Sequence, residues 1–149
     1  MLRLSKKTML ALEAVVDIAI NARPDPVQSK EITQRQGIPQ RYLEQVMQSL
    51  VHACSLKGVR GPRGGYRLAK ERRRITAGDV VRVVSVLEAE AEPALNGASP
   101  IGEKIVRPMI QDFHEKLMHE LDAVTIEDLC NAVEREGLSD GAKNMDFTI

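Results

Sequence analysis

The 149 residues include only two Phe, two Tyr and no Trp, so the chain can form one domain whose core consists of Leu, Val, Ile, Ala and Met. A net charge of zero hides a division: residues 1–87 hold 16 Lys and Arg against 7 Asp and Glu, and residues 88–149 hold 5 against 14. Two isolated cysteines, with no segment apolar enough for a signal or a membrane span, argue against a secreted or membrane protein and favour the cytoplasm.

The first predicted helix begins after Ser5, a suitable N-cap, and carries apolar residues at helical spacing to about Ala22. Lys6 and Lys7 lie in its first turn, where free backbone N–H groups already favour an anion. We therefore expect this helix start to contact a phosphate. The proline-rich sequence at 23–26 ends the helix.

A helix-turn-helix unit follows. A short helix opens at Ser29 and ends at Gly37, and a second helix runs from Pro39 to about Ala53. Its apolar stripe faces the core, while its opposite, polar face is suited to the major groove of DNA. That polar face carries Arg41, Glu44, Gln45 and Gln48. Without further context, a merely solvated face is the alternative interpretation.

The sequence Leu56–Ala69 predicts a β-hairpin, with strands at Leu56–Arg60 and Tyr66–Ala69 and a tip of Gly and Pro. Arg60, Arg63 and Arg67 give this hairpin a basic surface, and its glycines allow a close approach of the backbone to a ligand. An ordinary surface hairpin is the alternative. A basic hairpin directly after a helix-turn-helix is typical of a winged helix that binds duplex DNA.

The remaining sequence predicts helices outside the DNA-binding unit. A fourth helix is capped by Thr76, and residues 88–100 are expected to be an acidic linker. Residues 101–136 are expected to be dimerisation helices and residues 137–149 a flexible tail. The apolar seam predicted to pair with a second copy of the chain consists of Ile110, Phe113, Leu117, Leu121 and Val124.

Three motifs occur in register: Gly-Ile-Pro-x-x-Tyr-Leu-Glu-Gln at 37–45, Val-Arg-Gly-Pro-x-Gly-Gly-Tyr-x-Leu at 59–68 and Thr-Ala-Gly-Asp-Val at 76–80. With them the chain resembles the Rrf2 family of bacterial transcription regulators over about residues 1–136. The resemblance implies a mainly α fold with a small β-hairpin wing: a winged helix-turn-helix DNA-binding domain at 1–87 plus a long dimerisation helix. It also implies a homodimeric repressor of promoter DNA. The candidate DNA-binding residues are Lys6, Lys7, Gln40, Arg41, Tyr42, Glu44, Gln45, Gln48, Arg60 and Arg63.

Two departures from the family pattern have consequences. Cluster-binding members of this family carry three cysteines around the linker, whereas residues 88–100 contain none, and Lys104 and Arg107 stand near the expected ligand positions. We therefore expect no iron–sulfur cofactor and no metal site. The junction after the recognition helix, Ala-Gly-Leu in such regulators, is Ala53-Cys54-Ser55 here, which predicts strain at the helix end and a weakened core position.

Other function classes have less support. The acidic second half could dock on a protein partner, such as an enzyme or a polymerase, and this is the main alternative. The sequence contains no nucleophile–base pair or phosphate-binding loop, and its three histidines are scattered, so we do not expect an enzyme. A redox regulator that uses Cys54 or an atypical cluster is a further alternative, although we expect Cys54 to be a half-buried structural residue.

Overall fold

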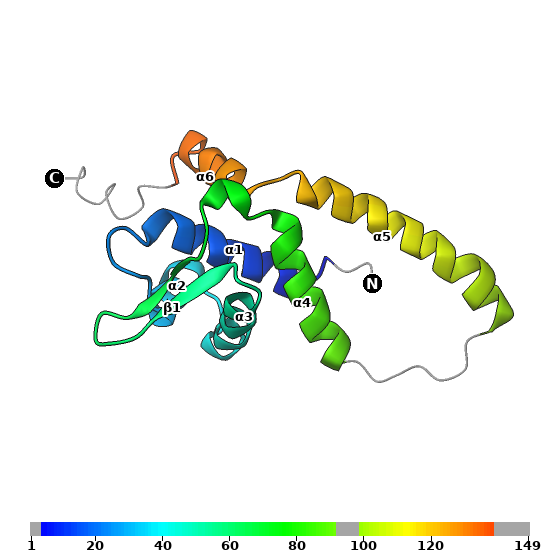
Figure 1. Cartoon of the computed structure of the whole chain (residues 1–149), viewed down its shortest axis with the longest axis horizontal. Helices are drawn as coiled ribbons and strands as arrows, with labels where there is room; N and C mark the ends of the chain where they lie inside the picture. Colours follow the sequence, from blue (N-terminus) through cyan, green and yellow to red (C-terminus); the bar gives the residue numbers. More distant parts are fainter. Residues whose placement is uncertain (1–3, 92–98, 139–149) are drawn as a thin grey trace.

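A computed structural model describes residues 4–91 and 99–138. Its helices are α1 (Lys6–Asn21), α2 (Ser29–Gln36), α3 (Gln40–His52), α4 (Ala77–Ala91), α5 (Arg107–Asp122) and α6 (Ile126–Arg135). Two strands, β1 (Leu56–Val59) and β2 (Gly65–Leu68), form an antiparallel hairpin. The prediction of a mainly α fold with a small hairpin wing is confirmed (Figure 1).

The core lies where α1, α3 and α4 meet. Apart from Cys130, its fully buried side chains are aliphatic or Met, as the composition required. The largest of them are Ile18, Ile32, Ile38, Leu43, Met47 and Leu50. Because α3 buries Leu43 and Met47, its opposite face is held towards solvent.

The helix starts follow the local sequence closely. The Ser5 hydroxyl accepts a hydrogen bond from the N–H of Thr8 at 3.3 Å, which confirms the predicted N-cap of α1. Thr76 and Asp79 form a reciprocal pair of bonds at the start of α4, each 3.0 Å long. At the turn before α3, Gly37 adopts a left-handed conformation with φ of +68°. α3 begins at Gln40, one position later than predicted, and Pro39 is its N-cap residue.

The hairpin is fixed to the body by backbone contacts. Val27 and Tyr66 exchange two backbone hydrogen bonds of 2.9 and 2.7 Å, so the segment before α2 extends the two-stranded sheet. A Cβ at Gly65 would overlap the carbonyl oxygen of Val27, and one at Gly64 would overlap that of Val59. These two glycines are therefore required by close backbone approach rather than by contact with a ligand.

The structure differs from the predicted linker at its start. Residues 88–91, which the sequence assigned to the linker, form the last turn of α4. Glu88 is buried there and accepts a hydrogen bond from the Ser5 hydroxyl at the start of α1. The alternation of Glu and Ala in this segment suits a helix, and the contact with Ser5 lies too far along the chain to be visible in the sequence. Residues 92–98 of the predicted linker lie outside the described residues.

The long helix that contains α5 has a turn near its start that is not α-helical. A π-helical turn, η2 (Gly102–Val106), leads directly into α5, and Pro108 lies in the first turn of α5, where it does not interrupt the helix. The first half of α5 lies away from the rest of the molecule (Figure 1). Thr125 and Asp128 form a capping box at the start of α6. The predicted tail at 139–149 lies outside the described residues.

The end of α3 contains the strain that its sequence suggested. The N–H groups of Cys54 and Ser55 donate to the carbonyl oxygens of Val51 and Leu50, both at 3.0 Å, which defines a Schellman motif. Cys54 takes the position in this motif that glycine favours, with φ of +62°. A residue with a Cβ pays roughly 1 kcal/mol or more for that conformation.

We therefore expect Cys54→Gly to raise the free energy of unfolding by about 0.5–1 kcal/mol in urea denaturation, because relief of strain exceeds the entropy that glycine adds to the unfolded chain. Ala53→Gly is the matched control, since Ala53 has φ of −80° and glycine there should destabilise the protein. Equal losses in both variants would contradict the strain at Cys54.

Candidate nucleic-acid interface

One face of α3 is polar and exposed along its whole length. Its exposed residues are Gln40, Arg41, Glu44, Gln45 and Gln48. The amide nitrogen of Gln40 donates to the carboxylate of Glu44 at 3.1 Å, and the Arg41 guanidinium forms no hydrogen bond within the described residues. Arg and Gln are the side chains that bind guanine and adenine edges in the major groove. The structure thus brings five of the predicted contact residues onto one surface.

Tyr42 lies apart from that face. Its hydroxyl donates to the backbone oxygen of Lys7 at 2.6 Å, and the Lys7 ammonium lies 5.9 Å from the centre of its ring. Burial, with a smaller effect of the Glu88 carboxylate, raises the pKa of Tyr42 to about 12. Tyr42 therefore fastens the start of α3 to the start of α1, and it keeps Lys7 beside the recognition helix.

The hairpin tip presents its arginines unequally. Arg60 and Arg63 are exposed at the tip, as expected of a wing. Arg67 differs, because its guanidinium donates to the backbone oxygen of Pro24 at 3.0 Å. Gln28 makes a longer contact, 3.5 Å, with the oxygen of Pro62. Arg67 thus anchors the wing to the segment before α2 instead of contributing to its outer surface.

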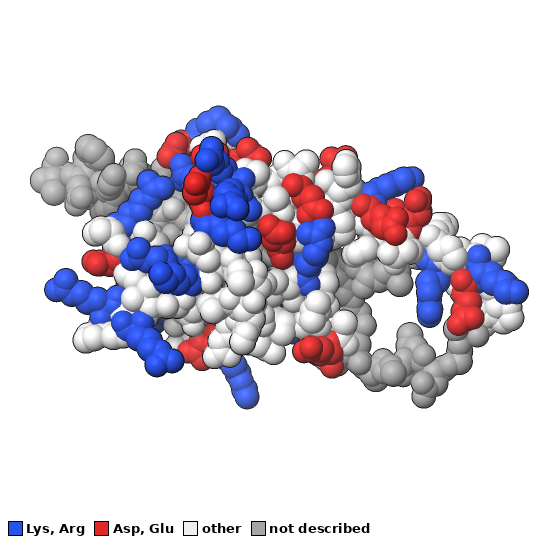
Figure 2. All heavy atoms as spheres, in the orientation of Figure 1, with Lys and Arg blue, Asp and Glu red and all other residues white. Residues whose placement is uncertain are grey.

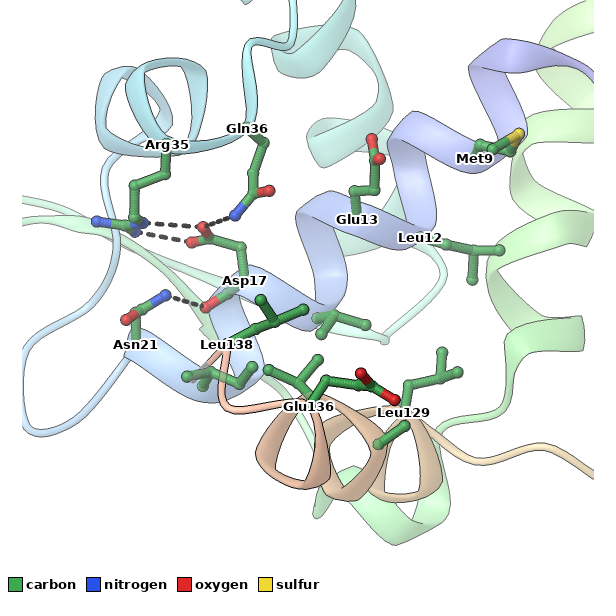
Figure 3. A pocket seen from close by; sticks show the side chains of 14 residues that line it. Met9, Leu12, Glu13, Asp17, Asn21, Arg35, Gln36, Leu129, Glu136 and Leu138 are labelled. Atoms are coloured by element: carbon green, nitrogen blue, oxygen red, sulfur yellow. Dashed lines mark hydrogen bonds and ion pairs between the residues drawn. The ribbon is translucent and has the colours of Figure 1, made fainter. Parts of the chain in front are cut away.

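An ion pair between a buried aspartate and a partly exposed arginine, which the sequence interpretation missed, joins α1 to α2 of the helix-turn-helix. Asp17 of α1 is 2% exposed, and its carboxylate accepts two hydrogen bonds from Arg35, at 2.7 and 2.9 Å. Gln36 donates a third at 2.8 Å (Figure 3). The hydrogen bonds that Arg35 donates to the Asp17 carboxylate raise the pKa of the Arg35 guanidinium. The sequence contained one sign of this ion pair: the acidic Asp17 stands between the apolar Val16 and Ile18.

Basic side chains gather on the winged-helix part of the molecule. Figure 2 shows Lys and Arg over the hairpin side, whereas α4 and α5 carry both signs of charge. This distribution agrees with the unequal charge of the two sequence halves and suits a polyanion on the winged-helix side. The start of α1 adds Lys6 and Lys7, both exposed.

The predicted dimerisation residues differ in exposure. Ile110, Leu117, Leu121 and Val124 are half-buried within the chain, and only Phe113 is exposed, at 51%. The C-terminal half of α5 packs beside α4, where Arg82 of α4 forms an ion pair with Asp122 of α5. In the first half of the long helix, further apolar side chains are exposed without having been assigned to the seam.

The two cysteines lie in different environments. Cys54 is exposed, so the expectation of a half-buried structural cysteine was wrong: its turn directs the side chain away from the core. Cys130 is buried in α6, and burial raises the pKa of its thiol.

Within residues 4–91 and 99–138, no three His, Cys, Asp or Glu side chains are grouped to hold a metal. Among the described helices, none is long and apolar enough to cross a membrane.

Comparison with known proteins identifies the family. The model of the family described as "Rrf2: Iron-dependent Transcriptional regulator" matches residues 4–132. The chain belongs to the Rrf2 family. It is 32% identical, over 96% of its length, to the HTH-type transcriptional regulator IscR of Cronobacter sakazakii, of which 89% is covered. The chain is therefore a DNA-binding transcription regulator and not an enzyme.

Solved Rrf2-type structures have the same fold. The chain matches T. potens IscR with a TM-score of 0.69 and 31% identity, covering 91% of this chain and 90% of that one. It matches CymR, the global cysteine regulator of B. subtilis, with a TM-score of 0.63 and 33% identity, covering 89% and 98%. Both similarities extend through the winged helix and the long helix, which confirms the predicted fold.

An iron-dependent family raises the question of whether these residues fit an iron–sulfur cluster. A cluster requires several thiolate ligands within a few ångströms of one another. Cys54 lies at the end of α3 and Cys130 is buried within α6, and residues 92–98 contain neither Cys nor His. The residues present do not fit the cluster that thiolates hold.

We accordingly expect protein purified without oxygen to be colourless and to bind operator DNA without a cofactor. The measurement is the visible absorbance spectrum together with iron and sulfide analysis. The Cys54→Ser variant, a control for a cluster shared between two chains, should give the same spectrum. Stoichiometric iron and sulfide in the unmodified protein would contradict this expectation and point to carboxylate ligands such as Glu90 or Glu92.

Proposed function

We propose that this Rrf2 protein is a cytoplasmic homodimeric repressor that binds duplex promoter DNA. The observation that carries the proposal is the exposed polar face of α3 beside a basic wing. In this arrangement α3 enters the major groove, where Arg41 and Gln45 contact base edges. Arg60 of the wing enters the adjacent minor groove, and Lys6, Lys7 and Arg63 contact phosphates.

A two-fold dimer supplies two such surfaces, which suits paired half-sites one helical turn apart. The exposed Phe113 and the apolar residues before it on the long helix support pairing through α5. Repression follows when the dimer occupies promoter DNA. Docking of the acidic second half on a protein partner stays an alternative prediction, and a pull-down beside a gel shift separates the two.

The first test concerns the wing. Arg60→Ala should lower the slope of log affinity against log salt by about 1, because one cationic contact with DNA is lost. The preference for sites with a narrow, A·T-rich minor groove should fall as well. Fluorescence anisotropy across such sites measures both effects. Lys116→Ala is the control, since Lys116 pairs with Asp112 on α5. Unchanged binding by Arg60→Ala would remove Arg60 from the DNA contact.

The second test concerns the dimer. Phe113→Glu should shift the protein towards monomers, because it places a charge in an apolar interface. Phe113 is half-exposed in one chain, so the substitution should leave the fold of the monomer intact. Gln111→Glu, also exposed on α5, adds the same charge outside the seam and should remain dimeric. Analytical ultracentrifugation distinguishes these outcomes, and a dimeric Phe113→Glu would contradict the role of this residue.

A further inference from the structure

The Thr-Ala-Gly-Asp-Val motif at 76–80 lies where the long helix meets the winged helix (Figure 1). Two backbone hydrogen bonds of 2.8 Å join this segment to the turn between α5 and α6. The N–H of Ala77 donates to the carbonyl oxygen of Val124, and the N–H of Ile126 donates to that of Ile75. The backbone of the turn after α5 is therefore fixed to the start of α4.

The last residue of α5 is also held by α4. Arg82 of α4 donates a hydrogen bond to the carboxylate of Asp122, and its guanidinium lies 3.7 Å from an oxygen of Asp79. Gly78 is buried against the Asp122 carboxylate, and a Cβ at this glycine would overlap it. Asp122 thus lies between a guanidinium that attracts it and a backbone position that admits no side chain. We call the contact of Gly78, Arg82 and Asp122 the clasp.

The clasp contributes direction more than stability. The side chains of Arg82 and Asp122 are 51% and 39% exposed, and ion pairs at such sites add little to the free energy of unfolding. Apolar side chains of α5, such as the buried Met118, also hold the helix to its own chain. Apolar contacts are non-directional, whereas hydrogen bonds between a guanidinium and a carboxylate require a defined geometry. The angle at which α5 leaves α4 therefore depends on the clasp.

This angle matters because α5 acts as a lever. The first half of the long helix lies away from the winged helix (Figure 1). Met109 and Asp122 are separated by about 20 Å of helix. A tilt of about 10° at one end of such a lever moves the other end by about 3.5 Å, close to the rise of one base pair in DNA. In a dimer that pairs through the exposed part of this helix, that movement would take the second recognition helix out of register with its half-site.

We propose that Gly78, Arg82 and Asp122 are positioning residues that determine which separation of half-sites the protein prefers in its operator. All three lie outside α3 and the wing, so they act through the angle between α5 and the winged helix and not by contact with DNA. The inference rests on the proposed homodimer, and it adds the residues that select among operators of different spacing.

Binding to duplexes of altered spacing tests the clasp in the full-length protein. The probe is the palindromic duplex that the parent protein selects from a random library, with versions whose half-sites are one base pair closer or farther apart. Arg82→Ala should lower the ratio of affinities for the selected and altered spacings about fivefold, because a freer hinge no longer penalises the wrong spacing. Its affinity for a duplex with one half-site should not change. Asp112→Ala is the matched control, since it removes an ion pair with Lys116 that stays within α5, and it should keep the parental ratio.

A double-mutant cycle tests whether Gly78 and Asp122 act through one contact. Gly78→Ala and Asp122→Ala should each lower the ratio as Arg82→Ala does. The double variant should fall no further than Asp122→Ala, because the added methyl group then meets no carboxylate. A parental ratio in either Arg82→Ala or Asp122→Ala, measured on dimeric protein, would overturn the inference and leave the homodimer standing. A parent protein that selects only unpaired half-sites would instead refute the homodimer, and the inference with it.

Discussion

The orientation of the helix-turn-helix depends on one ion pair, between the buried Asp17 of α1 and the partly exposed Arg35 of α2. An isolated carboxylate in the position of Asp17, between core residues of α1, would cost several kcal/mol. The bidentate Arg35 and the amide of Gln36 offset that cost, and they do so only when α2 lies against this part of α1. Because α2 leads into α3 through the tight turn at Gly37, the same contact sets the direction in which α3 projects. Because the Asp17 carboxylate is buried, loss of the Arg35 partner would leave an uncompensated charge in the core and destabilise this arrangement of α1 and α2.

α1 consequently holds α3 and α4 in place and also forms one wall of an apolar groove. At its start, the backbone oxygen of Lys7 accepts a hydrogen bond from the Tyr42 hydroxyl, and the Ser5 hydroxyl donates one to the Glu88 carboxylate. Both α3 and α4 are therefore fixed to the same turn of α1. One side of α1 enters the core, and the other lines the groove shared with α6. A molecule that filled this groove would therefore contact the same helix that holds α3 through Lys7 and α2 through Asp17.

The sequence predicted those parts of the fold that local chemistry determines. The caps at Ser5 and Thr76, and the helix-turn-helix with its basic hairpin, involve residues within a few positions of one another. The sequence did not reveal contacts between distant segments. The contact of Arg67 with Pro24 and the burial of Glu88 both depend on partners more than forty residues away. The exposure of Cys54 was missed for a different reason, since it follows from the direction of a strained turn.

The apolar period of the long helix shows the same limit at the level of assembly. Periodicity predicts that a face is buried but not whether its cover comes from the same chain. Leu117 and Leu121 are partly covered by their own chain where α5 lies beside α4, whereas Phe113 and the residues before it are not. One continuous stripe is thus covered by its own chain along only part of its length. The proposed homodimer would rest on the part that a single chain leaves exposed, and this part begins at Ile101, before the seam that the sequence indicated.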